Sequence, residues 1–221
     1  MALKSVRTER TRLADAVYDE ILDAIIKGDI GADDRLVQER LAAELQISRT
    51  PVREALLRLE QDGILVTSAR GGFKLHRLSA PEIKELYQAR AAIEGQAIRI
   101  LAVARDEADL ETLRRTIIRE EDIQSKTVAN YFDANRAIHR QLVALAGNRY
   151  LLEMFDMIWN RAVAYQLFAA IEKVDLSKSL GDHMALADAV ATGDATVAMD
   201  AIVAHIVDGY QLQLEALDMV E

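Results

Sequence analysis

The stretch SRTPVREAL, residues 48–56, decides how the first third of this chain folds. Ser48 and Thr50 are both residue types that cap the N-terminus of a helix. Pro51 fits a first helical turn, because its missing N–H would have no partner there in any case. Apolar residues then recur at helical spacing until Gly63, a typical helix stop. This pattern predicts a helix that starts at the beginning of the stretch and ends near Gly63.

Two arginines lie on the same face of that predicted helix. Arg49 and Arg53 are one turn apart at its N-terminal end, beside an apolar stripe of Val52, Leu56 and Leu59. A recognition helix needs cationic side chains there, because its N-terminal residues meet base edges and phosphates in the major groove of DNA. A solvated face with two arginines has the same spacing, so the spacing alone leaves both interpretations open.

The segments around the stretch complete a known unit. Apolar periodicity predicts helices over residues 11–27 and 36–45, and the alternating residues of 64–75 predict a β-hairpin. Three helices followed by a hairpin are typical of a winged helix-turn-helix. The hairpin tip carries Arg70 and, at Gly71, a backbone that can approach a groove closely.

Composition restricts the class of protein. The chain has 221 residues with 51% hydrophobic and 5% aromatic residues, which favours helices over a β-sandwich. It has no cysteine, so disulfides, thiolate zinc sites and cysteine nucleophiles are excluded. No apolar run approaches the roughly 18 residues of a membrane span, and the basic N-terminus lacks the apolar region of a signal peptide. The simplest expectation is a cytoplasmic protein without a membrane partner.

Charge divides the chain into two parts. Residues 1–78 hold 13 Lys/Arg and 13 Asp/Glu, whereas residues 79–221 hold 14 and 23 and carry the whole net charge of −9. Such an asymmetry suggests two domains with different partners. We expect a winged helix-turn-helix domain over 1–78 and a second domain over 79–221.

The second part is predicted to be entirely helical, so the fold class is mainly α: a winged helix-turn-helix followed by an all-α antiparallel helical bundle. A Ser79-Ala80-Pro81-Glu82 sequence opens the first helix, and Gly-Asn and Gly-Asp pairs separate later ones. The predicted helices are 80–104, 106–126, 128–146, 148–171, 175–192 and 194–218.

Three of the four histidines of the chain lie in this helical part. His139, His183 and His205 belong to three different predicted helices, and Asn135 lies one turn before His139 on the same face. One histidine on an apolar helix is more often a packed core residue than a ligand. Three on separate helices favour a shared site, because neutral imidazole is a common ligand of divalent metals and facing helices can bring ligands together. Asp133 is rotated about 200° from Asn135 and is a poor substitute for it.

The segment from Leu36 to Phe73, LVQERLAAELQISRTPVREALLRLEQDGILVTSARGGF, resembles the GntR family of bacterial transcription regulators. The resemblance departs from the family at Gln46, where glycine is usual before the turn, and at Glu39, where some members carry a DNA-contacting arginine that Arg35 or Arg40 would replace. It implies double-stranded DNA as a partner and the following contact residues: Arg40, Ser48, Arg49, Thr50, Arg53, Arg70 and Gly71.

The helical part resembles the FCD effector domain of the FadR subfamily, in its shorter, VanR-like form with six helices. The resemblance rests on the segment YFDANRAIHRQLVALAGNRYL, residues 131–151, and on the spacing of His183 and His205. It implies one divalent ion, zinc or nickel, held by Asn135, His139, His183 and His205. Asn135 is a departure, because many members have aspartate there and a neutral amide binds metal less tightly.

The same resemblance implies a small organic-acid effector bound near the metal. Arg90 falls where the family places an arginine facing the effector cavity, and Asn160 and Arg161 are further candidates. An alternative for Arg90 is a salt bridge with Glu94, one turn on.

The sequence as a whole predicts a metabolite-responsive, DNA-binding regulator, most simply a repressor, that binds a palindromic operator as a homodimer. A metal-dependent enzyme is the rival hypothesis, but no general base stands at helical spacing beside the histidines, as Glu does in H-E-x-x-H. A third hypothesis is a dimerisation module whose histidines are simply packed.

Overall fold

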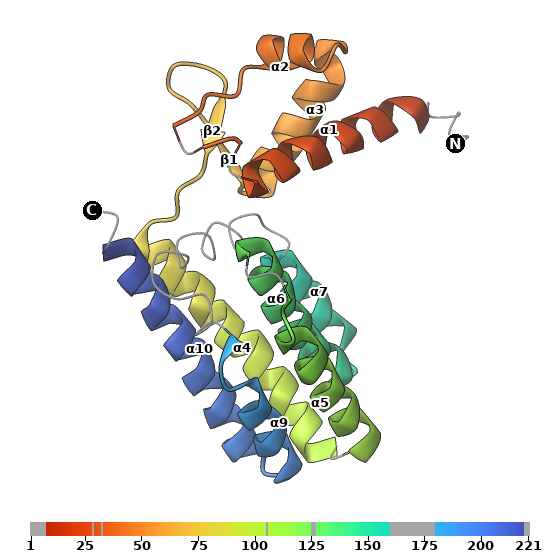
Figure 1. The fold of residues 1–221 in the computed structure, drawn as a ribbon, viewed down its shortest axis with the longest axis vertical. Coiled ribbons are helices and arrows are strands. Elements are labelled where there is room, and N and C mark those ends of the chain that lie inside the picture. The colour runs from red at the N-terminus through yellow and green to blue at the C-terminus, as the bar shows by residue number, and fades with distance from the viewer. Residues whose placement is uncertain are drawn as a thin grey trace, which may run out of the picture. The chain divides into compact units, whose positions relative to one another are not determined.

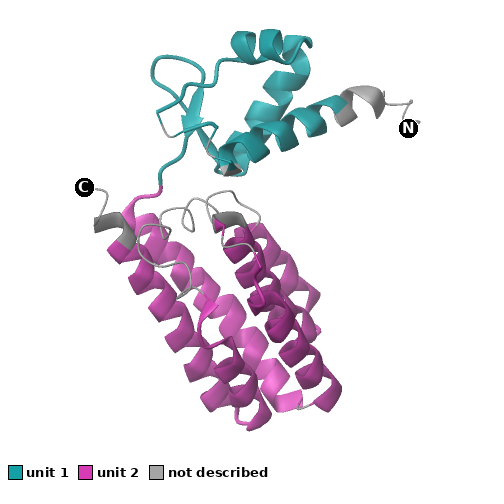
Figure 2. Cartoon of the chain, in the orientation of Figure 1, with its two compact units in different colours: residues 1–77, 161–163 teal, residues 78–160, 164–221 magenta. Residues whose placement is uncertain are grey.

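The chain forms two compact units, shown in different colours in Figure 2. The first ends at Arg77 and the second begins at Leu78. In this computed structural model the described residues are 8–27, 29–31, 33–104, 106–124, 127–159 and 180–218.

The first unit is a winged helix-turn-helix, as predicted. Its hairpin is antiparallel, with Leu65 opposite Leu75. The backbone of Leu36 pairs with that of Phe73 through two N–H···O bonds of 2.9 Å, so the segment before the second helix extends the sheet. The elements, labelled in Figure 1, are α1 (Thr8–Ile26), α2 (Gln38–Glu44), α3 (Arg49–Gln61), β1 (Leu65–Thr67) and β2 (Phe73–Leu75).

Helix α3 is the centre of the core of this unit. The side chains of its apolar stripe are fully buried, together with residues of α1 and of both strands. Ser48 is the N-cap residue by its extended backbone, although its side chain makes no capping hydrogen bond, and Thr50 lies inside the helix. The opposite face of α3 is thereby left to solvent, as an amphipathic helix requires.

The wing depends on one glycine. Gly72 has a φ of +74°, and a Cβ atom added there would lie 2.6 Å from the carbonyl oxygen of Leu36. Both the conformation and the close approach exclude a side chain. Glycine at this position therefore allows the hairpin to pair with the segment before α2.

The turn between α2 and α3 contains a strained residue. Gln46 has a φ of 55°, a left-handed conformation that favours glycine and is strained for other residues. We expect Gln46→Gly to raise the free energy of unfolding by about 0.5–1 kcal/mol, because relief of about 1–2 kcal/mol of backbone strain exceeds the entropy cost of glycine. Urea unfolding measures the difference. Gln61→Gly, in the right-handed conformation of α3, should instead destabilise by about 0.5–1 kcal/mol, and equal effects of the two variants would contradict the assignment of strain.

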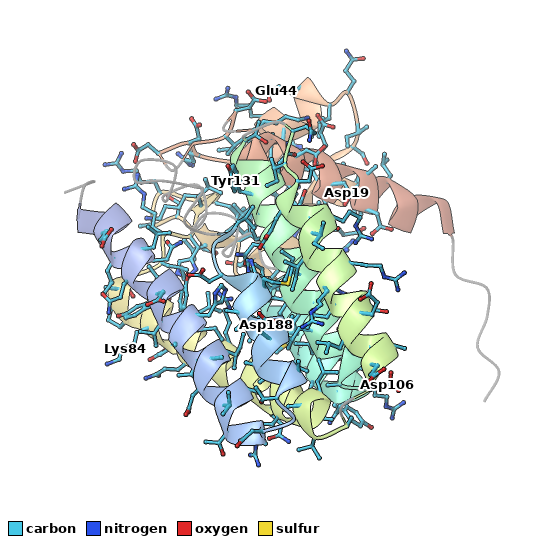
Figure 3. The ribbon with its side chains drawn as sticks, turned by 60° about the horizontal axis from the view of Figure 1, so that its bottom comes forward. Asp19, Glu44, Lys84, Asp106, Tyr131 and Asp188 are labelled. Atoms are coloured by element: carbon cyan, nitrogen blue, oxygen red, sulfur yellow. The ribbon has the colours of Figure 1, made fainter. Side chains whose placement is uncertain are left out.

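The second unit is a bundle of helices, as predicted. Helix α4 packs against α10, α6, α7 and α9, and α9 also packs against α5. Figure 3 shows α9, which carries the labelled Asp188, lying beside α10. The described helices are α4 (Ala80–Ala104), α5 (Glu107–Glu121), α6 (Val128–Leu145), α7 (Arg149–Trp159), α9 (His183–Ala191) and α10 (Ala195–Asp218).

Helix starts follow local capping. Ser79 and Glu82 form a reciprocal capping box, with Ser79 N–H donating to the Glu82 carboxylate at 2.8 Å. The side chain of Asp106 accepts from two backbone N–H groups of α5, and that of Thr127 accepts from one backbone N–H group of α6. These short polar residues satisfy N–H groups that the helix itself leaves unpaired.

Two helix boundaries differ from the predicted ones. Helix α5 ends at Glu121 instead of near residue 126, because Asp122 leaves the helical conformation. Helix α9 begins at His183 instead of near residue 175, since Asp182 before it is left-handed with a φ of 66°. The predicted helix 148–171 is described as far as Trp159. Within the described residues, no helix is both long and apolar enough to cross a membrane.

Candidate metal centre

A group of polar side chains is buried inside the otherwise apolar bundle. Burying a polar or charged group costs free energy unless the group forms hydrogen bonds or ion pairs. The fold therefore has to supply partners for these side chains. Among the described residues of the second unit, the buried polar side chains are Arg90, Glu94, Thr116, Asn135, His139, His183 and Gln213.

Three histidines converge here: His139 and His183 of this buried group and the partly buried His205. His139 comes from α6, His183 is the first residue of α9, and His205 comes from α10. The Nε2 atom of His139 lies 3.3 Å from that of His183 and 3.2 Å from that of His205. One nitrogen of each ring lies within 4.8 Å of the others. The bundle thus brings together the three histidines that the sequence placed on three separate helices.

The environment of His139 determines which of its nitrogens carries the proton. Its Nδ1 atom lies 2.5 Å from the carboxylate of Glu94 on α4, and both side chains are fully buried. A carboxylate only accepts hydrogen bonds, so Nδ1 carries the hydrogen and Nε2 presents its lone pair to the other two rings. The ring also stacks on Trp159, with centroids 5.8 Å apart, which restricts its rotation.

His183 is oriented in the same way by different partners. Its Nδ1 atom lies 3.1 Å from the carboxylate of Glu121 and 3.2 Å from the carbonyl oxygen of Leu180. Both partners are acceptors, so Nδ1 again donates and Nε2 presents a lone pair. The left-handed backbone of Asp182 turns the chain sharply just before His183, a strained conformation of the kind often found at functional sites.

The two lone pairs facing each other at 3.3 Å fit a shared divalent ion. Without a cation or a proton between them, two nitrogen lone pairs at that distance repel each other. Two nitrogens bound to one ion at about 2.1 Å are about 3.0–3.4 Å apart, for angles between 90° and tetrahedral. The residues present therefore suit a metal ion held by imidazole nitrogens.

The pKa values of the group favour the neutral imidazoles that ligation requires. Burial lowers the pKa of His139 to about 4, against the opposing pull of Glu94. Burial, assisted by the neighbouring histidines, lowers the pKa of His205 to about 2. Burial alone would raise the pKa of Glu94, but His139 and Arg90 outweigh it and lower that pKa to about 2. At neutral pH these two histidines are therefore neutral and Glu94 is ionised.

Asn135 is buried on α6 one turn before His139, so it lies on the same face of the helix as that histidine. Asp133, two residues earlier, is exposed and faces elsewhere, as its rotation about the helix predicts. This leaves Asn135 as the one residue of the predicted ligand set that would offer an amide oxygen.

Arg90 is buried beside the histidines and is held by three neighbours. Its Nε atom donates to the Glu94 carboxylate at 3.0 Å, which is the salt bridge considered as an alternative from the sequence. Its guanidinium carbon lies 4.5 Å from the centroid of the Trp159 ring and 5.1 Å from that of Tyr87. The other two candidate effector residues, Asn160 and Arg161, lie outside the described residues.

Sequence reasoning missed the roles of Glu94 and Glu121 as partners of the histidines. Glu94 had one available signal, an acidic residue inside the apolar segment AAIEGQA, where it would be costly without a partner. Glu121 had none, because its charge stands in a run of acidic residues at the end of α5.

The predicted DNA-contacting residues lie on the surface of the first unit. Arg49 and Arg53 at the start of α3 are exposed, as are Arg70 and Gly71 at the tip of the wing. Ser48 is exposed too, and Thr50 is partly so. A cationic surface at the N-terminus of a recognition helix and a cationic wing tip are available to DNA in this arrangement.

Neighbouring charges already engage some of these arginines. Arg49 pairs with Glu39 at 3.4 Å, and Arg40 pairs with Glu44 at 2.8 Å, in both cases with exposed side chains. Exposed pairs of this kind contribute about 0–1 kcal/mol and can exchange for phosphate. Arg35 instead donates to the carbonyl oxygen of Gly71 at 2.6 Å, so it supports the wing.

Comparison with known proteins matches both units. Residues 13–75 match the bacterial regulatory proteins of the gntR family, and residues 85–208, more than half of the chain, match the FCD domain. The chain belongs to the GntR family and carries an FCD domain. The resemblance seen in the sequence is thereby confirmed for both parts of this GntR-family protein.

Relatives of this GntR-family protein are named as transcription regulators, which is the class of protein expected from the sequence. The Nta operon transcriptional regulator of Aminobacter aminovorans is 32% identical over 128 residues, which cover 58% of this chain and 61% of that regulator. The transcriptional repressor GlaR of Escherichia coli is 25% identical over 86% of this chain and 90% of its own. The structure of Escherichia coli McbR/YncC has the same fold, with a TM-score of 0.69 and 21% identity over 92% of this chain and 97% of that one.

Proposed function

We propose that this chain is a metabolite-responsive repressor that binds a palindromic DNA operator as a homodimer and releases it when a small carboxylate binds at a metal centre in residues 79–221. The observation that carries the sensing part is the convergence of the nitrogens of buried His139, buried His183 and partly buried His205. Residues 1–78 would bind the operator.

The first unit supports the DNA-binding part. Arg49 and Arg53 lie at the exposed N-terminal end of α3, where a recognition helix meets the major groove, and Arg70 lies on the wing. One such domain makes few cationic contacts and binds weakly. Two copies on a palindrome roughly add their binding free energies, so a homodimer follows from the physics of the site.

The metal would be held by His139, His183 and His205, with Asn135 as the fourth ligand. Zinc or nickel fits this set of neutral nitrogen and amide-oxygen donors. A divalent ion with these ligands supplies open coordination positions to which a small bidentate carboxylate can bind. The protein itself keeps His139 and His205 neutral through burial, and it fixes the tautomers of His139 and His183 through Glu94 and Glu121.

Arg90 is the candidate for recognition of the effector within the described residues. It is buried next to Glu94, and its guanidinium lies near two aromatic rings that hold it in place. A guanidinium binds a carboxylate with two parallel hydrogen bonds, which suits an organic acid. Asn160 and Arg161 complete the proposed effector-binding set. The sign of regulation, repression, agrees with that of the relative GlaR, which is named as a transcriptional repressor.

Operator binding in the presence of organic acids tests the proposal. A panel of small hydroxy and dicarboxylic acids is titrated into the zinc-loaded protein on a labelled operator, with and without a chelator. At least one acid should weaken operator binding by about tenfold or more, a coupling of about 1.4 kcal/mol, and the chelator should abolish the effect. A response that persists unchanged under the chelator would contradict the metal-dependent sensing.

A further inference from the structure

We propose that Glu94 is a positioning residue of the metal centre, which fixes His139 for ligation and links it to Arg90. The inference rests on the proposed metal centre. It goes beyond that proposal because Glu94 is not one of the expected metal ligands. Glu94 would affect metal binding only through the ligand His139.

Each oxygen of the Glu94 carboxylate accepts a hydrogen bond from a different side chain. Its Oε2 atom lies 2.5 Å from Nδ1 of His139, and its Oε1 atom lies 3.0 Å from Nε of Arg90. The Glu94 side chain is 0% exposed, and that of Arg90 is 10% exposed. Both carboxylate oxygens are therefore used as acceptors by two donors from two different helices.

Two acceptors are what this position requires. Arginine is only a donor, and the His139 tautomer that ligates through Nε2 is a donor at Nδ1. Glutamine has nearly the shape of glutamate but offers one acceptor and one donor. If its oxygen faced Arg90, its amide would face Nδ1 of His139 and would select the tautomer that carries its hydrogen on Nε2, which cannot ligate.

Charge gives Glu94 a second role. The proposed ligands, three imidazoles and the amide of Asn135, bring no negative charge to the ion. Among the described residues that bond directly to these histidines, Glu94 is the fully buried anion, whereas the side chain of Glu121 is 33% exposed. A buried charge is screened less than an exposed one, so Glu94 should raise the basicity of its histidine more strongly.

Arg90 connects this effect to the surroundings of the site. Its positive charge attracts the Glu94 carboxylate, which also polarises His139. The carboxylate of a bound effector that pairs with Arg90 would weaken the attraction between Arg90 and Glu94, so the hydrogen bond from His139 to Glu94 would become stronger. Such an effector would tighten metal binding, and the ion would tighten effector binding by the same factor, because coupling free energies are reciprocal.

The chain offers a matched control for the first role. Glu121 bonds to Nδ1 of His183 much as Glu94 bonds to His139, but His183 has a second acceptor in the carbonyl oxygen of Leu180. In Glu121→Gln the tautomer of His183 can still be maintained by that carbonyl. The two substitutions are chemically identical and differ in whether the histidine retains another acceptor.

The experiment measures zinc affinity by competition with a chelator for the full chain and three variants. Glu94→Gln should lose 10–100-fold in affinity, and Glu121→Gln no more than about threefold. In the double variant Arg90→Met/Glu94→Gln the glutamine oxygen is free to face His139, so affinity should recover toward that of the unchanged protein. The metal-free proteins provide a second readout, because nitrogen NMR distinguishes the Nδ1–H from the Nε2–H tautomer of His139.

The outcomes separate this inference from the proposed function. If the unchanged protein binds neither zinc nor nickel, the metal centre itself is wrong and the inference falls with it. If it binds zinc and Glu94→Gln equals Glu121→Gln in affinity and tautomer, only the role of Glu94 is refuted. If Glu94→Gln does not fold, the double variant decides: recovered folding and affinity support the inference, and loss of zinc binding in a folded double variant overturns it.

Discussion

Removal of the divalent ion is expected to destabilise the helical bundle by about 4 kcal/mol, relative to the protein with free zinc at roughly 1,000 times its dissociation constant. The ion would bind the folded arrangement of His139, His183 and His205, which the unfolded chain does not maintain. Binding of free zinc therefore stabilises only the folded state, by an amount that grows with the ratio of the zinc concentration to the dissociation constant. Thermal unfolding with zinc and with excess chelator measures the difference.

A histidine outside the bundle gives the matched control for this experiment. His139→Gln should abolish the response of the unfolding transition to zinc, whereas His76→Gln in the first unit should retain it. The comparison uses the response to zinc and not the absolute stability, because a change at buried His139 also removes one of the two donors that satisfy the buried carboxylate of Glu94. Unfolding that is insensitive to both zinc and chelator in the unchanged protein would refute the metal centre.

Arg53→Ala is expected to weaken binding to a palindromic operator by between about 30-fold and 10⁴-fold. One good arginine contact to a base contributes about 1–3 kcal/mol, and a homodimer loses it twice. The arginine is exposed on α3, so the fold should remain intact. Fluorescence anisotropy on an operator selected from a random pool measures the affinity, and the stoichiometry should be two chains per site.

Lys27→Ala serves as the charge-matched control. Lys27 is an exposed cation after α1 that pairs with Asp23, away from the start of α3. Its removal should reduce affinity slightly and equally for all DNA sequences, as loss of a general charge does. Specific binding that survives Arg53→Ala at the level of the Lys27→Ala protein would contradict the assignment of α3 as the recognition helix.

Local sequence information was sufficient for the elements and their order. The stripe from Val52 to Leu59 has helical spacing, and the glycines at 71 and 72 interrupt alternating residues, so the predicted helix and hairpin are confirmed. The box at Ser79 and Glu82 started α4 at its predicted residue. A helix boundary that depends on the conformation of one residue could not be predicted from periodicity. The start of α9 after the left-handed Asp182 is an example.

By itself, the sequence determined which side chains share a helix face: Asn135 with His139, Arg90 with Glu94. This follows because helical spacing sets the direction of a side chain relative to its own axis. Only the tertiary structure decided which faces meet. The pairing of Glu94 with His139 spans 45 residues and depends on how α4 and α6 are packed, as the meeting of the three histidines depends on α6, α9 and α10. Helix packing sets these rotations through the shapes of many apolar side chains at once, so no short segment of the sequence records them.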